Sequence, residues 1–346
     1  MADGLLQVKG TIDLAQFWPN GTSDADTTKI LVTVGSDDFL FRPSPEEEFR
    51  VTHVFDDATV VGKVRRPAID KNGKITIRLQ GIDATELHYR PVAAKKFKKP
   101  LTDEQQKQHD LFLEWNLDFR QYFAETATVA LYNQLTCTGQ DSVECRVVSA
   151  VDEPGEVFDV YGRMVGDILV DIGGSEVNIN QWLVESGYAL PAFYNCMSNA
   201  EIDALMECAR TAQSDQNGLW DNFYTPAIIP FDWNMVCRKK GSTFDPDWDK
   251  GSAILPKLFR RQAAYEVNKR AGMVAGTFKK YLKSAKDGLY ETGDFLANGE
   301  NATVLSLDGQ ISKNAVRMTP EQMVFKENTN VSLKKPQNAP VVWWTE

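Results

Sequence analysis

The stretch ITIRLQGIDATELHY, from Ile75 to Tyr89, constrains the fold of this chain more than any other. Apolar and polar residues alternate along its first half, which predicts a β-strand with one face in the core. Charged side chains follow at the strand end, where Arg78 is succeeded by Asp83 and Glu86. Such a group is either ordinary surface charge or a site that binds a metal and a phosphate.

The composition favours a protein that acts away from membranes. The 346 residues are 42% apolar, enough for one large domain or two smaller ones. No apolar run approaches the ~18–20 residues that span a bilayer, so no membrane association is expected. The beginning, MADGLLQVKG, lacks the basic stretch and apolar core of a secretory signal. We therefore expect a cytoplasmic protein, although a secreted protein whose signal has been removed would look the same.

The cysteines and histidines exclude several kinds of site. The five cysteines are odd in number and have no CxxC spacing, so we expect them to be reduced and not to bind zinc. Only three histidines are present, and neither HExxH nor a Ser-His-Asp pattern occurs. An enzyme built from this sequence would therefore rely on carboxylates and arginines.

Charge is divided unevenly along the chain. Residues 1–230 hold 20 Lys+Arg and 35 Asp+Glu, a net charge of −15, whereas residues 231–346 hold 18 and 13, a net charge of +5. The proline-bearing segment TPAIIPFDW lies at the division. The sequence thus predicts an acidic domain over 1–230 and a smaller, basic accessory domain over 231–346, through which a protein partner could bind.

Periodicity predicts a mixed α+β architecture. Alternation indicates strands, and apolar residues three and four apart indicate helices. The expected strands are Leu5–Leu14, Thr28–Val34, Phe49–Val64, the one opening at Ile75, Ser142–Ala150 and Met164–Asp171. The expected helices are one capped by Thr102 and those over Phe119–Leu135, Val177–Gly187, Ser198–Asn217 and Pro256–Lys283.

Several short motifs then follow one another in a particular order. They are Arg78-x4-Asp83-x2-Glu86, the turn DVYGR at 159–163, the helix VNINQWLVESG at 177–187, and Leu219-Trp220. In this order they resemble the staphylococcal nuclease (thermonuclease) family over about residues 5–222, with insertions near 35–72 and 90–118. The resemblance implies a five-stranded OB-fold β-barrel with flanking helices, to which this chain adds a smaller C-terminal α+β domain.

The chain departs from the family pattern at two places. Thr85 stands where the family has proline before the glutamate, which loosens the turn but removes no charge. The family's acidic DGDT turn, whose second aspartate binds calcium, has two candidate counterparts. The DADT turn at 24–27 keeps that aspartate as Asp26, whereas the DDAT turn at 56–59 places Ala58 there. We favour Asp26, because the other assignment removes a metal ligand.

The resemblance implies a calcium-dependent nuclease that hydrolyses DNA, RNA or both. Calcium takes oxygen ligands, and a charged guanidinium fork matches phosphate oxygens. The implied residues are Asp26, Asp83 and the Ala84 carbonyl as calcium ligands, Glu86 to hold or deprotonate the attacking water, and Arg78 and Arg163 to grip the phosphate.

Further residues are candidates for contact with the nucleic acid. Tyr161 could hydrogen-bond a terminal phosphate, and Lys95 and Lys96 lie in an insertion that could line the substrate groove. Phe193 and Tyr194 would either stack on a base or belong to the core.

Two alternatives stay open at this point. The segment 256–286 holds nine Lys+Arg and one acidic residue, and it either attracts nucleic acid or packs on the acidic domain. The rival to a nuclease is a catalytically inactive barrel that binds nucleic acid or a protein. Asp26 at the metal position favours the enzyme. Retention of Arg78, Glu86 and Arg163 together also favours it, because a pure binder has no need of a carboxylate that handles water.

Overall fold

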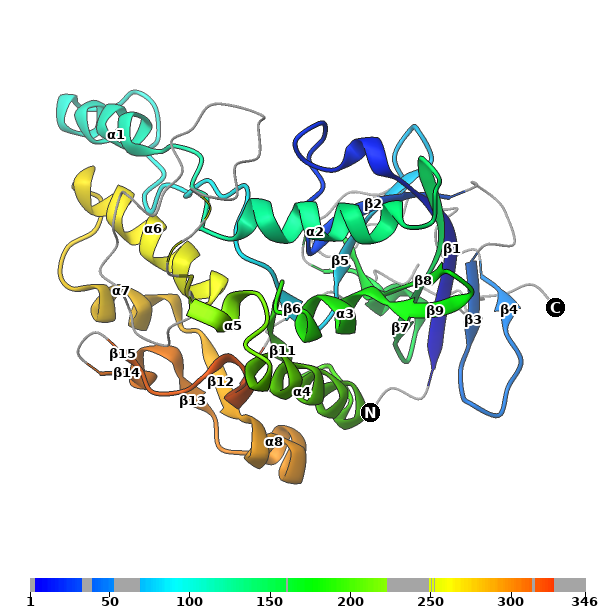
Figure 1. The fold of residues 1–346 in the computed structure, drawn as a ribbon. Helices are drawn as coiled ribbons and strands as arrows, with labels where there is room; N and C mark the ends of the chain where they lie inside the picture. Colours follow the sequence, from blue (N-terminus) through cyan, green and yellow to red (C-terminus); the bar gives the residue numbers. More distant parts are fainter. Residues whose placement is uncertain are drawn as a thin grey trace, which may run out of the picture.

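The fold is built on a closed β-barrel. The computed structural model describes residues 4–32, 39–52, 69–159, 161–222, 249, 251, 253–312 and 315–326. Five strands close in the spatial order β1, β2, β5, β8, β7 and back to β1 (Figure 1). Their bounds are β1 (Leu5–Asp13), β2 (Thr27–Leu31), β5 (Lys74–Leu79), β7 (Ser142–Ala150) and β8 (Met164–Ile172). Only β5 and β8 pair in parallel within the barrel, and the expected α+β class with an OB-fold barrel is confirmed.

The alternation along β5 places one face of the strand in the core. Ile75, Ile77 and Leu79 are at most 2% exposed, whereas Arg78 lies on the opposite face of the strand. Burying each aliphatic side chain is worth about 1.5–3 kcal/mol, so a one-residue slip that exposed them would be strongly disfavoured. The register sets Thr27 of β2 opposite Arg78, which brings the start of β2 to the end of β5.

The first insertion adds a hairpin beside β1. β3 (Phe39–Arg42) pairs antiparallel with the first half of β1, and β4 (Arg50–Val51) pairs with β3. Of the strand expected over Phe49–Val64, β4 is the described part, and residues 53–68 lie outside the described residues.

Helices and short strands surround the barrel. Their bounds are α1 (Asp103–Trp115), α2 (Ala124–Thr136), α3 (Ile179–Glu185), α4 (Asn199–Ser214), α5 (Leu219–Asn222), β6 (Ile82–Asp83), β9 (Ser175–Asn178) and β10 (Leu190–Pro191). Thr102 caps α1 in a capping box with Gln105. α2 begins at Ala124 instead of Phe119, because Phe123 adopts a left-handed φ of 71° that no α-helix contains. No helix within the described ranges has the length and apolar character needed to cross a bilayer.

The C-terminal region is a smaller α+β unit, as expected. Its elements are α6 (Pro256–Arg270), α7 (Phe278–Ala285), β12 (Gly288–Glu291), α8 (Thr292–Asn298), β13 (Leu305–Ser306), β14 (Ile311–Ser312), β15 (Ala315–Val316) and β16 (Met323–Phe325). β16 pairs in parallel with β11 (Phe193–Tyr194). Figure 1 shows these elements, in yellow to red, near α4 and on the opposite side of the molecule from β3 and β4. One cluster of buried apolar residues continues from the barrel into this region.

The helix expected over Pro256–Lys283 is two helices. α6 ends at Arg270 and α7 begins at Phe278, with Gly272 and Gly276 at φ values of 69° and 94° between them. Glycine reaches positive φ readily, and such residues interrupt a right-handed helix. Nine residues of α6 are buried, so this helix is part of the packed interior and not a free basic surface.

Asn180 ties together the strands beneath the strand-end residues. Its side chain is fully buried, and Nδ2 donates to the Gln80 carbonyl at 2.9 Å and to Asp167 Oδ1 at 2.8 Å. Its Oδ1 accepts a hydrogen bond from the Ile168 N–H at 3.2 Å. The Asn180 amide therefore joins the end of β5 to β8. The sequence motif that contains Asn180 did not predict this link.

We expect Asn180→Ala to lower the free energy of unfolding by on the order of 3 kcal/mol, because it leaves buried backbone groups of Gln80 and Ile168 without these partners. The measurement is the urea midpoint of the full chain. Asn133→Ala, at an exposed position of α2, is the matched control and should change stability little. Equal effects of the two substitutions would contradict the bracing role.

Candidate active site

The candidate site forms where β5 ends and the chain turns into β6. Gly81 makes this turn at a φ of 72°, a conformation that favours glycine, and β6 then pairs with β10 so that Asp83 lies opposite Leu190. The side chain of Asp83 is 2% exposed. The N–H of Glu86 donates to Gln121 Oε1 at 2.9 Å. The charged end of the strand is therefore folded into the protein and is not surface decoration.

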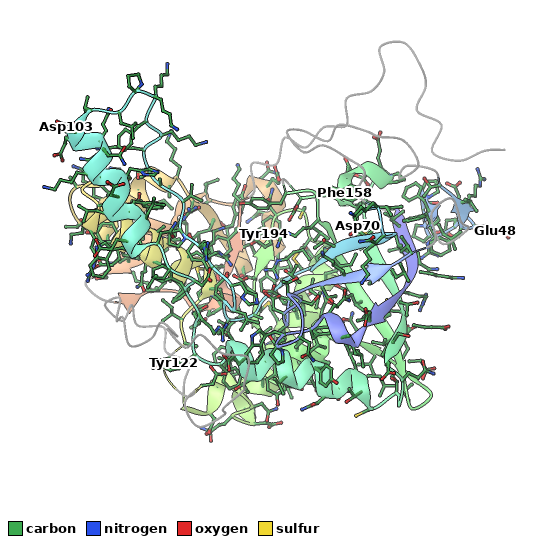
Figure 2. All side chains as sticks on the ribbon, turned by 90° about the horizontal axis from the view of Figure 1, so that it is seen from above. Glu48, Asp70, Asp103, Tyr122, Phe158 and Tyr194 are labelled. Carbon is green, nitrogen blue, oxygen red and sulfur yellow. The ribbon has the colours of Figure 1, made fainter. Side chains whose placement is uncertain are left out.

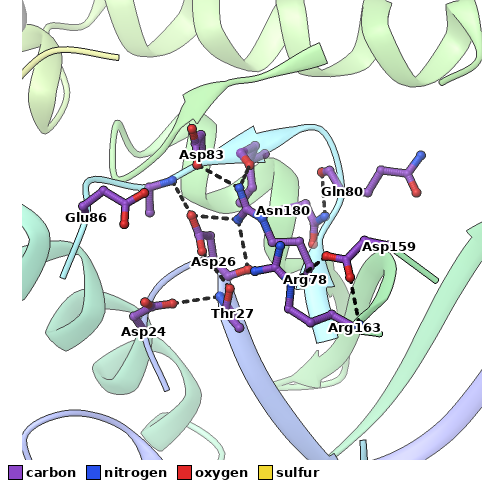
Figure 3. A network of polar contacts seen from close by, with 12 residues as sticks. Asp24, Asp26, Thr27, Arg78, Gln80, Asp83, Glu86, Asp159, Arg163 and Asn180 are labelled. Atoms are coloured by element: carbon purple, nitrogen blue, oxygen red, sulfur yellow. Dashed lines mark hydrogen bonds and ion pairs between the residues drawn. The ribbon is translucent and has the colours of Figure 1, made fainter. Parts of the chain in front are cut away.

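Arg78 bridges the two aspartates of the site. Its Nη1 lies 2.7 Å from Asp26 Oδ2, and its Nη2 lies 2.8 Å from Asp83 Oδ1 (Figure 3). Nη2 also donates to the Ile82 carbonyl at 3.0 Å. The Arg78 side chain is 13% exposed, so this guanidinium is a positioned positive charge of the kind that binds an anion well.

The DADT turn at the start of β2 supplies Asp26. Within the turn the Thr27 N–H donates to Asp24 Oδ1 at 2.9 Å. The Ala84 N–H donates to Asp26 Oδ2 at 2.8 Å, so Ala84 meets the cluster through its N–H (Figure 3). The structure thus brings Asp26 to the strand-end residues, and the alternative turn at 56–59 lies outside the described residues.

The carboxyl groups of the site repel one another. Burial raises the pKa of Asp24 well above its usual range, and the charges of Asp26 and Glu86 raise it further. Burial is also the main cause that raises the pKa of Glu86 to about 7. The charge of an arginine lowers this pKa, and smaller contributions from Asp83 and Asp26 raise it. Glu86 can therefore accept and release a proton near neutral pH, as a general base must.

That arginine is Arg260 of α6, which no sequence pattern had linked to this site. Its Nη2 lies 3.2 Å from Asp83 Oδ2, and its Nη1 pairs with Glu86 Oε1. Burial raises the pKa of Asp83, but the charges of Arg260 and Arg78 outweigh it and hold that pKa below its usual value. Asp83 is thus ionised between two guanidinium groups.

Part of the chain is similar to a known protein family. Residues 76–222 match the family model described as staphylococcal nuclease homologue. This part of the chain is a staphylococcal nuclease-like domain. None of the curated proteins matches the chain. Members of the family are mostly nucleases. Three of the site residues lie beyond the matched range, Asp24 and Asp26 before it and Arg260 after it, so the fold completes the site of the nuclease-like domain from both flanks.

The donor types in the nuclease-like domain suit calcium, the metal that its family typically uses. Carboxylate oxygens such as those of Asp26 and Asp83 are hard ligands. The pKa of the neighbouring Asp24 is raised first by burial and then by the charges of Asp26 and Glu86. Within the described ranges, no three Asp, Glu, His or Cys side chains are already arranged to hold a metal together. Both oxygens of Asp83 are paired with Arg78 and Arg260. The donors fit calcium in kind, and a cation that binds Asp83 must displace a guanidinium.

Arg163 and Tyr161 lie on the turn before β8. Arg163 Nε is 2.7 Å from Asp159 Oδ2, and Asp159 also accepts from the backbone of both residues. β8 is the parallel neighbour of β5, with Val165 opposite Arg78, so Arg163 shares the outer face with Arg78. Its described ion pair is with Asp159, not with the carboxylates of the site. Tyr161 is 77% exposed and free to meet a ligand from solvent.

The remaining substrate candidates lie in β11 and in the segment before α1. Phe193 is fully buried in β11, so of the two alternatives weighed for its ring, the core is the one observed. Tyr194 is partly buried against Phe325, with ring centroids 6.1 Å apart, between the barrel and the C-terminal elements (Figure 2). Lys95 and Lys96 are exposed, and no described contact joins them to the site.

Two parts of the site were missed in the sequence. Arg260 belongs to a run that was noticed only for being basic, and no spacing relates it to Asp83. Gln121 holds the Glu86 backbone from the segment between α1 and α2, and a glutamine in a loop carries no signal of such a contact. Both contacts join residues far apart in the chain, so local pattern could not have found them.

Proposed function

We propose that this chain is a nuclease that hydrolyses phosphodiester bonds of DNA, RNA or both and depends on calcium. The observation that carries the proposal is the convergence of Asp26 with Arg78, Asp83 and Glu86 from two separate segments, in a domain whose family is mostly nucleases. An ordinary ion pair at the surface would not require these four charged residues to be gathered in a buried position.

Each residue of the cluster is suited to one part of the reaction. Asp26 and Asp83, with the Ala84 carbonyl, would hold calcium, which supplies charge neutralisation at the phosphate when it is bound. Glu86 takes the proton from the attacking water, since its pKa of about 7 lets it act as a base at neutral pH. Arg78 binds a phosphate oxygen and stabilises the charge that develops during the attack. Arg163, on the turn before the neighbouring strand β8, would bind the same phosphate.

The rival function is a nuclease-like module that binds nucleic acid without cutting it. One observation favours this rival, because both oxygens of Asp83 are paired with arginines, which compete with a metal for them. A barrel with such a neutralised site could still hold a nucleic acid backbone through Arg78 and Arg163.

The test is cleavage of single-stranded DNA, duplex DNA and RNA by the purified full chain, with calcium and with a chelator. We expect calcium-dependent cleavage that falls at least 100-fold in Asp26→Asn, since an amide is a weaker ligand and no longer carries charge. Asp203→Asn, which removes the same charge from an exposed position on α4, is the control and should cleave like the wild type.

Three other results would change the conclusion. Binding without cleavage of any substrate would overturn the nuclease and support the rival. Cleavage that persists in the chelator would remove calcium from the proposal. Cleavage that survives Asp26→Asn would move the metal ligand to Asp56 or Asp57.

A further inference from the structure

Arg260 reaches the site from outside the nuclease-like domain by direct ion pairs, and Lys257 on the same helix acts on Asp83 through its charge. The Arg260 guanidinium spans Asp83, at 3.2 Å from Oδ2 and 3.4 Å from Oδ1, and also pairs with Glu86. These are the carboxylates to which the proposed function assigns the metal and the attacking water. A residue in this position either blocks the site or takes part in it.

The helix that carries Arg260 is firmly attached. Gln121 Nε2 donates to the carbonyl of Ile254 just before α6 at 2.9 Å, while its Oε1 accepts from the Glu86 N–H at 2.9 Å. One buried amide thus ties the site loop to the approach to α6. Detachment of the whole helix would break both hydrogen bonds of this bridge, so we do not expect α6 to leave the site as a unit.

A second buried amide fixes the other half of the helix. Asn268 is fully buried, donates to the Val92 carbonyl at 3.0 Å and accepts from the Ala94 N–H at 2.7 Å. Residues 92–94 belong to the segment that follows the site loop. Both ends of α6 are therefore held to the chain that leaves Glu86, and any movement of Arg260 is confined to its side chain.

The side chain itself has room to move. It is 30% exposed, whereas Asp83 beneath it is 2% exposed, so the guanidinium covers the carboxylate from the solvent side. Asp83 keeps its pair with Arg78 at 2.8 Å when Arg260 leaves, so departure does not leave the buried Asp83 unpaired. The long aliphatic stem lets the head group shift while the helix stays in place.

We propose that Arg260 is an additional phosphate-contacting arginine of the active site, which exchanges its pairing with Asp83 and Glu86 for the substrate phosphate when a divalent cation binds. The inference rests on the proposed nuclease function. A cation and a guanidinium compete for the same carboxylate oxygens, so cation binding releases the fork. The oxygens of a phosphate at the site match the released guanidinium in geometry and charge, so the phosphate can bind it.

The experiment combines calcium titration by calorimetry without nucleic acid and cleavage kinetics on the full chain. We expect Arg260→Gln to bind calcium about tenfold more tightly, since the competing charge is gone, and to lose about 100-fold in kcat/KM, since a transition-state contact is gone. Arg270→Gln is the control on the same helix, because Arg270 pairs with Glu266 at the surface, and both quantities should stay at wild-type values. Arg260→Lys, which keeps the charge without the fork, should lie between the wild type and Arg260→Gln in both calcium affinity and kcat/KM.

The outcomes separate this inference from the proposed function. Tighter calcium binding with unchanged or faster cleavage would make Arg260 a mere counter-ion and overturn the inference alone. Unchanged calcium affinity would overturn the exchange. A wild type that cleaves nothing would overturn the proposed function and the inference with it. Circular dichroism checks the fold of Arg260→Gln, and Arg260→Lys carries the test if that variant fails to fold.

Discussion

Glu86→Gln is expected to lower kcat/KM for phosphodiester cleavage by roughly 10²–10⁴-fold, the range typical of a lost general base. Glutamine has the same shape and still offers an oxygen to Arg260, but it cannot accept a proton from water. Binding of nucleic acid should therefore change much less than turnover. The measurement is steady-state cleavage beside an equilibrium binding assay with the same oligonucleotide.

The pH dependence of the wild type supplies a second readout of Glu86. Its pKa is raised to about 7, so the ionised form that acts as a base accumulates as pH rises through that value. Cleavage should therefore increase with pH up to this region and then level off. Bound calcium adds positive charge and lowers the pKa, which shifts the rise to lower pH.

Glu114→Gln is the matched control, at an exposed position of α1 away from the site. It should retain both the wild-type rate and the wild-type pH profile. A Glu86→Gln enzyme that cleaves within a factor of a few of the wild type would exclude Glu86 as the base. So would a wild-type profile that shows no rise with pH at or below neutral pH.

Arg78→Gln is expected to damage stability and catalysis together. The guanidinium lies between Asp26 and Asp83, and removing one partner of such a buried pair costs about 3–5 kcal/mol. Cleavage should fall by about 10²–10³-fold, as for a lost group that stabilises developing charge. Urea unfolding reports the first effect, and kcat/KM under conditions where the variant is folded reports the second.

Arg210→Gln is the control for charge removal, because the side chains of Arg210 and its partner Glu207 are 59% and 71% exposed. Surface pairs of this kind contribute little, so neither stability nor cleavage should change appreciably. An Arg78→Gln protein as stable as this control would show that the bridge between the aspartates is not a structural element. Calcium should restore part of the lost stability, since it replaces a positive charge between the same carboxylates.

Sequence reasoning succeeded where the deciding interactions are local. β7 begins and ends as expected, at Ser142–Ala150, and β8 differs by one residue, because alternation along a strand reports directly which face is buried. The capping box at Thr102 and the pairing of the DADT turn with the end of β5 also follow from short motifs. The order of those motifs along the chain was enough to indicate the OB-fold.

The errors occur where backbone conformation or packing overrides the local pattern. α2 starts late because of the left-handed Phe123, and the C-terminal helix divides at Gly272 and Gly276. The ring of Phe193 is buried because β11 pairs with β16, where its partner Val324 lies 131 positions further along the chain. Each outcome depends on partners that the neighbouring residues do not reveal.

By itself, the sequence determined the barrel strands, the fold class and the identity of the acidic and basic groups at the end of β5. Only the tertiary structure decided that Asp24 and Asp26 face Glu86, and that Arg260 pairs with Asp83 across 177 positions of the chain. The physical reason is that hydrophobic periodicity is read along the backbone, whereas ion pairing and pKa depend on distance and burial in space. A carboxylate becomes a base, a ligand or a counter-ion according to the charges that folding places beside it.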